Sequence, residues 1–214
     1  PSFDELGTVE ISQPQALGLA IQMMLTQVVL FGLPAIMGAI FLGNWRWYTG
    51  FPGRPAMVQL ALVPLIVAFV LPLVNLVYIP EDAIQFGESM KALEEALKEA
   101  ETKASASLEP VLKYYPWLSL LAIAVFPAIF EELFFRGFLQ QSLRRLMNVH
   151  VAVIVTAFIF SFIHGQVYGF FSRWLLGVAL GYLVVYANSI LPSILAHLVY
   201  NGFQVVLVSK QLNG

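Results

Sequence analysis

Long stretches without a single charged residue are the feature that most constrains the fold of this chain. Residues 16–42 contain only glutamine and threonine as polar side chains, and a second apolar stretch covers residues 57–79. About 20 apolar residues are enough for a helix to cross the hydrocarbon core of a bilayer. Of the 214 residues, 59% are hydrophobic and only 11% are charged. Soluble domains have about 25% charged residues, so the composition favours a membrane protein.

The hydropathy pattern predicts an all-α fold, a polytopic transmembrane helical bundle. About six spans are expected, over residues 16–42, 57–79, 115–146, 149–164, 170–186 and 190–208. Pro34 is expected to kink the first span. Aromatic residues and two arginines in residues 44–55 indicate an interfacial loop. No internal repeat is visible, so we predict a single membrane domain over residues 1–214, with a polar segment at 1–13.

A polar loop at residues 80–113 differs from the rest because it holds eight of the thirteen acidic residues. Apolar residues recur in it at spacings of three and four, and oppositely charged residues are paired at i,i+4. The apolar positions are Phe86, Met90, Leu93, Leu97 and Ala100, and the pairs are Glu94–Lys98 and Glu99–Lys103. The pattern predicts one amphipathic helix in an extramembrane loop. It is either a solvated connector or a docking surface for a substrate or partner.

Three polar fragments interrupt the apolar segments of the second half of the chain. They are Glu131 and Glu132 with Arg136, Phe160 with His164, and His197 with Asn201. An ionisable group at the bilayer centre costs about 3 kcal/mol unless it is paired or hydrated. Each fragment places two side chains four residues apart, on one helix face, so three helices can converge on one pocket. Their occurrence together indicates a functional site inside the membrane.

The residue types in these fragments suit hydrolysis. An ion pair between Glu132 and Arg136 would satisfy two costly groups and leave Glu131 as a candidate general base. The chain has no cysteine, and Ser161 and Ser189 lack a histidine-plus-acid arrangement, so water is the expected nucleophile. A carboxylate with a histidine can deprotonate water, and a second histidine with an asparagine amide can stabilise an oxyanion. These parts suit cleavage of a peptide or amide bond.

Simpler readings of single residues stay open. Glu132–Arg136 alone can be a packing ion pair, Phe160 a core residue that shapes the pocket, and His197 a hydrogen-bonded helix residue. A metal is not favoured, because the His-Glu-x-x-His helix of zinc peptidases is missing and the candidate ligands lie on three helices. No cofactor is expected. With a net charge of −2 and no basic patch, no nucleic-acid partner is expected either.

The order Glu-Glu-x-x-x-Arg, Phe-x-x-x-His and His-x-x-x-Asn resembles the CPBP family of CAAX proteases and bacteriocin-processing enzymes, also called the Abi family. The resemblance is to its bacterial type and covers about residues 116–208, as a catalytic-type helix core. It implies a metal-independent intramembrane glutamate protease. The roles it implies are activation of water by Glu131 with His164, an oxyanion site of His197 with Asn201, and support by Arg136 holding Glu132.

The resemblance also implies a function and a location. The chain is expected to be an endopeptidase that cleaves a membrane-associated protein or lipid-anchored peptide in the bacterial inner membrane. The resemblance does not extend to a prenylated substrate. A non-catalytic accessory or scaffold subunit, with other membrane subunits as partners, is the open alternative. A transporter is less favoured, because two halves with corresponding broken helices are not visible in the sequence.

Overall fold

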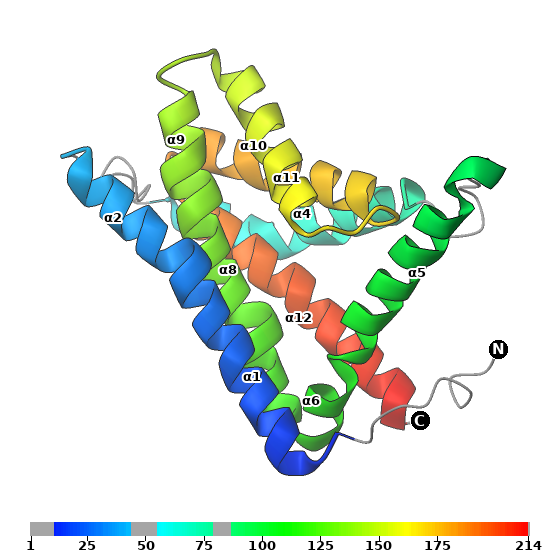
Figure 1. Ribbon diagram of the computed structural model, residues 1–214. Coiled ribbons are helices and arrows are strands. Elements are labelled where there is room, and N and C mark those ends of the chain that lie inside the picture. The colour runs from blue at the N-terminus through cyan, green and yellow to red at the C-terminus, as the bar shows by residue number, and fades with distance from the viewer. Residues whose placement is uncertain (1–10, 44–54, 79–86, 214) are drawn as a thin grey trace.

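The computed structural model describes residues 11–43, 55–78 and 87–213, and this part of the chain is helical without any β-strand (Figure 1). The predicted all-α helical bundle is thus confirmed. Three predictions fall wholly or largely outside the described residues: most of the polar segment at 1–13, most of the interfacial loop at 44–55, and Phe86 in the polar loop.

Five helical segments are long and apolar enough to cross a membrane. The first joins α1 (Gln13–Gln27), a π-helical turn at Val28–Gly32 and α2 (Leu33–Phe41), and the second is α4 (Met57–Leu76). The third joins α7 (Pro116–Ser119), a π-helical segment at Leu120–Val125, α8 (Phe126–Glu132), a second at Leu133–Leu139 and α9 (Gln140–Leu143). The last two are α11 (Phe170–Ala187) and α12 (Leu191–Asn213).

The expected span at residues 149–164 is a shorter helix. α10 (Val149–Ile163) has 15 residues. At 1.5 Å per residue it is about 22 Å long, less than the hydrocarbon core of about 30 Å. Six expected spans therefore correspond to five full-length candidates and one shorter apolar helix. α10 ends at Ile163 and His164 is its C-cap residue, so this histidine lies at a helix end.

Two of the π-helical segments end two residues before a proline. Proline lacks an N–H, and its ring displaces the carbonyl of the preceding turn. In the first span the N–H of Leu33 bonds to the carbonyl oxygen of Val28, five residues back, and the segment before Pro127 widens in the same way. The disturbance expected at Pro34 is therefore a π-helical turn within a continuous helical segment.

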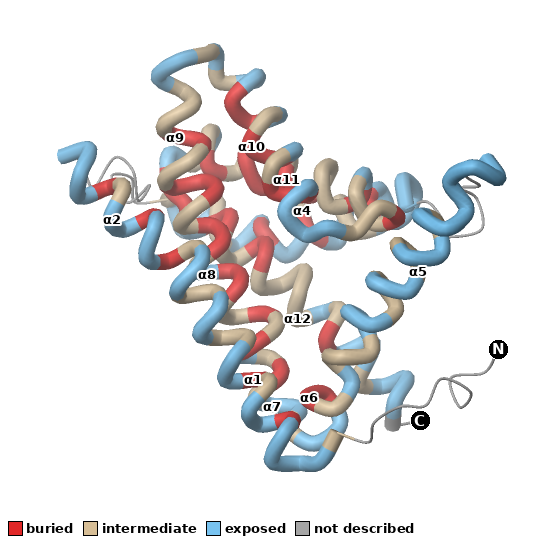
Figure 2. The backbone as a smooth tube through the Cα atoms, viewed as in Figure 1, coloured by how far each residue is buried: buried red, intermediate tan, exposed pale blue. Residues whose placement is uncertain are grey.

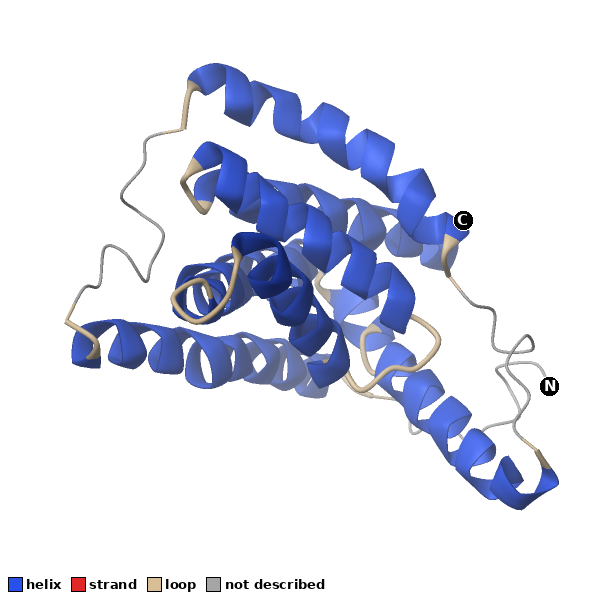
Figure 3. Ribbon diagram, turned by 90° about the horizontal axis from the view of Figure 1, so that it is seen from above, coloured by secondary structure: helices blue, strands red, loops and turns tan. Residues whose placement is uncertain are grey.

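The third span lies at the centre of the bundle. In its most apolar window 44% of the residues are buried, against 17% in each of the first two spans. Figure 2 shows buried residues along α8, α9 and α10, and mostly exposed residues along α1, α2 and α5. Seen from above, the helices lie beside and over one another (Figure 3). The polar residues of the third span are thus enclosed by the other helices.

Gly177 and Gly181 on α11 allow α10 and the third span to approach closely. A Cβ atom at Gly177 would lie only 3.0 Å from the Cβ of Ala157 on α10. The carbonyl oxygens of the two glycines accept hydrogen bonds from Arg136 (3.1 Å) and Gln140 (3.2 Å). Two residues four apart on one helix therefore match two residues four apart on another, which sets the relative position of the two helices.

The predicted amphipathic helix is α5 (Lys91–Ala106), which follows a 3₁₀ turn at Glu88–Met90 and precedes α6 (Glu109–Tyr114). Both predicted ion pairs are present, at 2.7 Å for Glu94–Lys98 and 2.6 Å for Glu99–Lys103. The hydrogen bond from Lys103, together with its charge, lowers the pKa of the exposed Glu99. None of the residues of this fully described helix is buried. α5 is therefore a peripheral element beside the bundle.

Candidate active site

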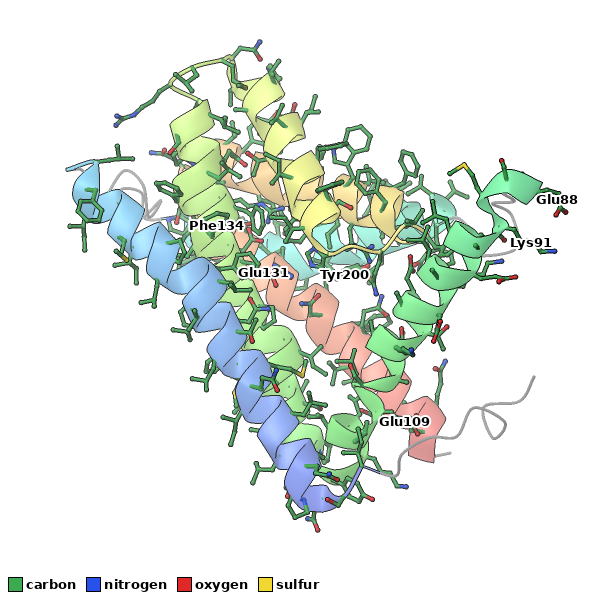
Figure 4. The ribbon with its side chains drawn as sticks, in the orientation of Figure 1. Glu88, Lys91, Glu109, Glu131, Phe134 and Tyr200 are labelled. Atoms are coloured by element: carbon green, nitrogen blue, oxygen red, sulfur yellow. The ribbon has the colours of Figure 1, made fainter. Side chains whose placement is uncertain are left out.

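The three polar fragments meet around one cavity of about 480 Å³, which we call the polar cavity. Five of the seven predicted site residues line it. They are Glu131 on α8, Phe160 on α10, His164 at the end of α10, and His197 and Asn201 on α12. Figure 4 shows Glu131 and Tyr200, two residues of its lining, on the neighbouring helices α8 and α12. Glu132 and Arg136 do not line the cavity. The predicted convergence of three helices is therefore present.

Glu131 is 5% exposed and has a neutral hydrogen-bond partner. Its Oε1 accepts a hydrogen bond of 2.9 Å from Nε2 of Gln27 on α1. Its Oε2 lies 4.0 Å from Nε2 of His197. This is too long for a direct hydrogen bond, but one water molecule can contact both atoms. Glu131 thus directs one carboxylate oxygen to the part of the cavity that a water nucleophile would need.

Glu132 points the other way, into a group that we call the buried ion-pair cluster: Glu132, Arg136, Ser193 and His197. Its Oε1 accepts hydrogen bonds from Nη1 of Arg136 at 2.7 Å and from Nδ1 of His197 at 2.9 Å. Its Oε2 accepts a hydrogen bond from Oγ of Ser193. All four side chains are at most 3% exposed. The predicted ion pair is present, and charge-assisted hydrogen bonds offset the cost of removing its charges from water.

Phe160 separates the buried ion-pair cluster from His164. Its side chain is 2% exposed, and its ring centroid lies 4.5 Å from the guanidinium carbon of Arg136, a cation–π contact. The same ring lies edge-on to His164, at 4.9 Å, and to His197, at 5.9 Å between centroids. Phe160 therefore holds both histidine rings by packing.

Hydrogen bonds assign the proton of each histidine ring. Nδ1 of His164 lies 2.7 Å from the carbonyl oxygen of Phe160, which can only accept, so Nδ1 carries the proton. Nδ1 of His197 faces the ion-paired carboxylate of Glu132 and carries its proton for the same reason. In both rings Nε2 is left for the polar cavity.

Asn201 is fixed by the third span. Its Nδ2 donates a hydrogen bond of 3.1 Å to the carbonyl oxygen of Ile123, in the π-helical segment Leu120–Val125. A side-chain amide has two N–H donors, so a second one is left for a group in the polar cavity. Asn201 and His197 lie four residues apart on α12 and present their donors on the same face.

The structure adds three site residues that the motifs did not reveal. Ser193 lies four residues before His197 on the same helix face, a spacing that could have indicated it. Gly177, which accepts from Arg136, belongs to a Gly-x-x-x-Gly pattern in an apolar helix, which is a known sign of close helix contact. Gln27 has no such signal, because it reaches Glu131 from a helix 104 residues away.

No metal-binding arrangement is found in the described ranges: no group of three or more histidine, aspartate and glutamate residues there is arranged to hold an ion. The side chains next to Glu132 use their donor atoms for its carboxylate. Independence from metals and cofactors stays a prediction.

Residues 113–203 match the model of a family described as type II CAAX prenyl endopeptidase Rce1-like. The match includes all seven predicted site residues and confirms the resemblance to the CPBP family of CAAX proteases over this part of the chain. Together with the five apolar segments, the match indicates an integral membrane protein whose residues 113–203 are similar to a protease family. No curated protein and no solved structure matches the chain significantly.

Proposed function

We propose that this chain is an intramembrane endopeptidase that uses water, activated by Glu131 and His164, to cleave a peptide bond. One observation carries the proposal: a carboxylate, two histidines and an asparagine from three helices line the same polar cavity. The match to a CAAX endopeptidase family over the same residues supports it.

In the proposed reaction, Glu131 and His164 take a proton from the water as its oxygen bonds to the carbonyl carbon of the substrate. Glu131 is available because its partner Gln27 is neutral, and His164 because its Nε2 is unprotonated. The proton then passes to the amine nitrogen as the C–N bond breaks. The remaining proton of the new carboxylic acid also passes to the amine, so the products are a carboxylate and an ammonium group and the reaction needs no other reactant.

The oxyanion is assigned to the residues on α12. Nδ1–H of His197 donates to Glu132, so Nε2 faces the carbonyl oxygen of the substrate and donates to it when the ring carries both protons, and the second N–H of Asn201 donates beside it. Glu132 thereby orients the ring of His197, and Arg136 and Ser193 hold Glu132 in place. The ion-pair cluster is assigned to support, without contact with the substrate.

The walls of the polar cavity favour a substrate that arrives from the bilayer. Leu19, Met23, Ile123 and Leu176 line it between the polar groups. We therefore propose a membrane-associated protein or a lipid-anchored peptide as substrate, and the bacterial inner membrane as the location. Other membrane subunits are proposed as partners only if the chain acts in a larger assembly.

The test uses purified protein in proteoliposomes and a fluorescence-quenched CAAX peptide, with and without a farnesyl group, as the probe. Glu131→Gln should reduce kcat by about 10²-fold or more, because the general base is lost. Glu109→Gln, at an exposed carboxylate on α6, is the matched control and should leave kcat unchanged. Turnover retained in Glu131→Gln would contradict the proposal. A wild type that does not cleave the peptide, and partner subunits that co-purify equally with the wild type, Glu131→Gln and His164→Ala, would together favour an accessory subunit.

A further inference from the structure

The extramembrane helix α5 contacts the loop that follows His164 through one carboxylate. Oε1 of Glu101 accepts hydrogen bonds from the backbone N–H groups of Val167, at 2.5 Å, and Tyr168, at 3.3 Å. These residues lie more than 60 positions later, in the loop between α10 and α11. A carboxylate that binds two adjacent N–H groups holds a loop more firmly than a neutral acceptor does.

This loop begins with His164. The next residue, Gly165, has a φ of +65°, a conformation that glycine adopts without strain, so the chain reverses direction directly after the histidine. His164 itself is attached to the bundle by its bond to the carbonyl oxygen of Phe160, and its side chain is exposed at the cavity. The position of the loop therefore bears directly on the position of the His164 ring.

Arg173, in the first turns of α11, fixes the same loop from the other side. Its Nη1 donates to Oε1 of Gln166 at 2.6 Å, and its Nη2 donates to the carbonyl oxygen of Gln166 at 2.8 Å. Arg173 lines the polar cavity and also an adjoining cavity of about 360 Å³ that Glu101 lines. The loop thus lies between a carboxylate of α5 and a guanidinium of α11.

None of the residues of α5, all of which the structure describes, is buried. Figure 4 shows Glu88 and Lys91 at the end of the helix that lies away from the bundle. Glu101, toward the other end of the helix, joins α5 to the loop after His164.

We propose that Glu101 is a positioning residue for His164, through which the extramembrane helix α5 sets the geometry of the polar cavity. This inference rests on the proposed function, because the role of His164 on the attacking water is assigned there. Displacement of α5 by a partner or by a membrane surface would release the loop and move the histidine. The soluble part of the chain would in this way control the membrane-embedded site.

Amide hydrogen exchange in nanodiscs tests the contact without any need for activity. Glu101→Ala should speed exchange at Val167 and Tyr168 by about tenfold, because both N–H groups lose a charged acceptor. Glu101→Gln keeps an acceptor oxygen and should lie between this variant and the wild type. Glu95→Ala, at an exposed carboxylate of the same helix, is the matched control. Equal exchange in Glu101→Ala and wild type, or an equal rise in Glu95→Ala, would overturn the proposal.

The rate of chemical modification of the histidines then reports a change in the position of the His164 ring. The rate at which diethyl pyrocarbonate modifies His164 should change in Glu101→Ala and return toward the wild-type rate in Glu101→Gln. The exposed His150, at the other end of α10, should react at an unchanged rate and serves as the internal standard. A change shared by both histidines would show a loss of structure instead of a local effect and would count against the proposal.

The cleavage assay links the contact to the reaction. Glu101→Ala should lower kcat by about tenfold with little change in KM, because a misplaced histidine affects the chemical step more than binding. An unchanged kcat would overturn the positioning role. Absence of cleavage by the wild type would defeat the proposed function, while the exchange experiment would still decide whether Glu101 holds the loop.

Discussion

The buried ion-pair cluster and the polar cavity lie side by side, yet their carboxylates have opposite surroundings. Glu132 receives hydrogen bonds from an arginine, a histidine and a serine. Glu131, the preceding residue, receives one from the neutral Gln27, and its other oxygen faces the cavity at 4.0 Å from Nε2 of His197. One carboxylate is thus fully engaged and the other is left open to react. Adjacent residues of the same type therefore have different surroundings, which is why we propose a structural role for Glu132 and a chemical role for Glu131.

The largest expected loss of stability follows from breaking the ion pair. Arg136→Met leaves the carboxylate of Glu132 buried without its cationic partner, so the free energy of unfolding should fall by about 3–5 kcal/mol. Unfolding of the purified protein in nanodiscs would measure it. Arg145→Met, at an exposed arginine after α9, should change it by less than about 0.5 kcal/mol. A similar small effect of Arg136→Met would remove the distinction between the two regions.

The next effect comes from the close helix contact behind the cluster. In Gly177→Leu the new side chain meets Ala157 and Nη2 of Arg136, so overpacking should cost about 1–3 kcal/mol. Gly18→Leu is the matched control, because a Cβ atom at Gly18 has no atom of the described structure within 4 Å. The comparison of the two unfolding free energies checks the prediction. Equal values would mean that a side chain at position 177 does not overpack the contact with Ala157 and Arg136.

A smaller loss is expected from the serine of the cluster. Ser193→Ala removes the donor to Oε2 of Glu132, which should lower the free energy of unfolding by about 1–2 kcal/mol. Ser142→Ala is the control, since this serine bonds only to a carbonyl oxygen of its own helical segment among the contacts described. Equal free energies of unfolding for the two variants would mean that the hydrogen bonds from Arg136 and His197 are sufficient to hold Glu132.

The smallest loss of stability is expected in the polar cavity. Glu131→Gln keeps an oxygen that accepts from Gln27, so the free energy of unfolding should change by less than about 0.5 kcal/mol. The same variant is the one expected to lose cleavage. A strong destabilisation by Glu131→Gln would show that Glu131 belongs to the structural cluster and that the comparison is wrong.

Much of the candidate site was predictable from the sequence, because charged groups in apolar segments are conspicuous. The seven residues of the three fragments were found in this way, and five of them line one cavity. The partners were harder to predict. Gln27 is one of several uncharged polar residues of its span, and nothing in its spacing points to Glu131. The attachment of Glu101 to the loop after His164 was not predictable either, since it joins residues 66 positions apart.

The helical fold was predictable for a related reason. Backbone groups in a bilayer must bond within the chain, so long apolar stretches predict helices and their approximate bounds. The widening before Pro127 came only from the structure. It depends on how a proline is accommodated by its neighbours, which local periodicity does not report.

The sequence by itself determined that this chain forms membrane helices and that Glu132 and Arg136 share a helix face, because hydropathy and i,i+4 spacing are local properties. Only the tertiary structure decided that the face of Glu131 meets His197 and Asn201, and that each histidine turns Nε2 toward the cavity. These facts depend on the rotation of α8 and α12 about their axes. That rotation is set by contacts between residues far apart in the chain, such as Arg136 with Gly177 and Asn201 with Ile123.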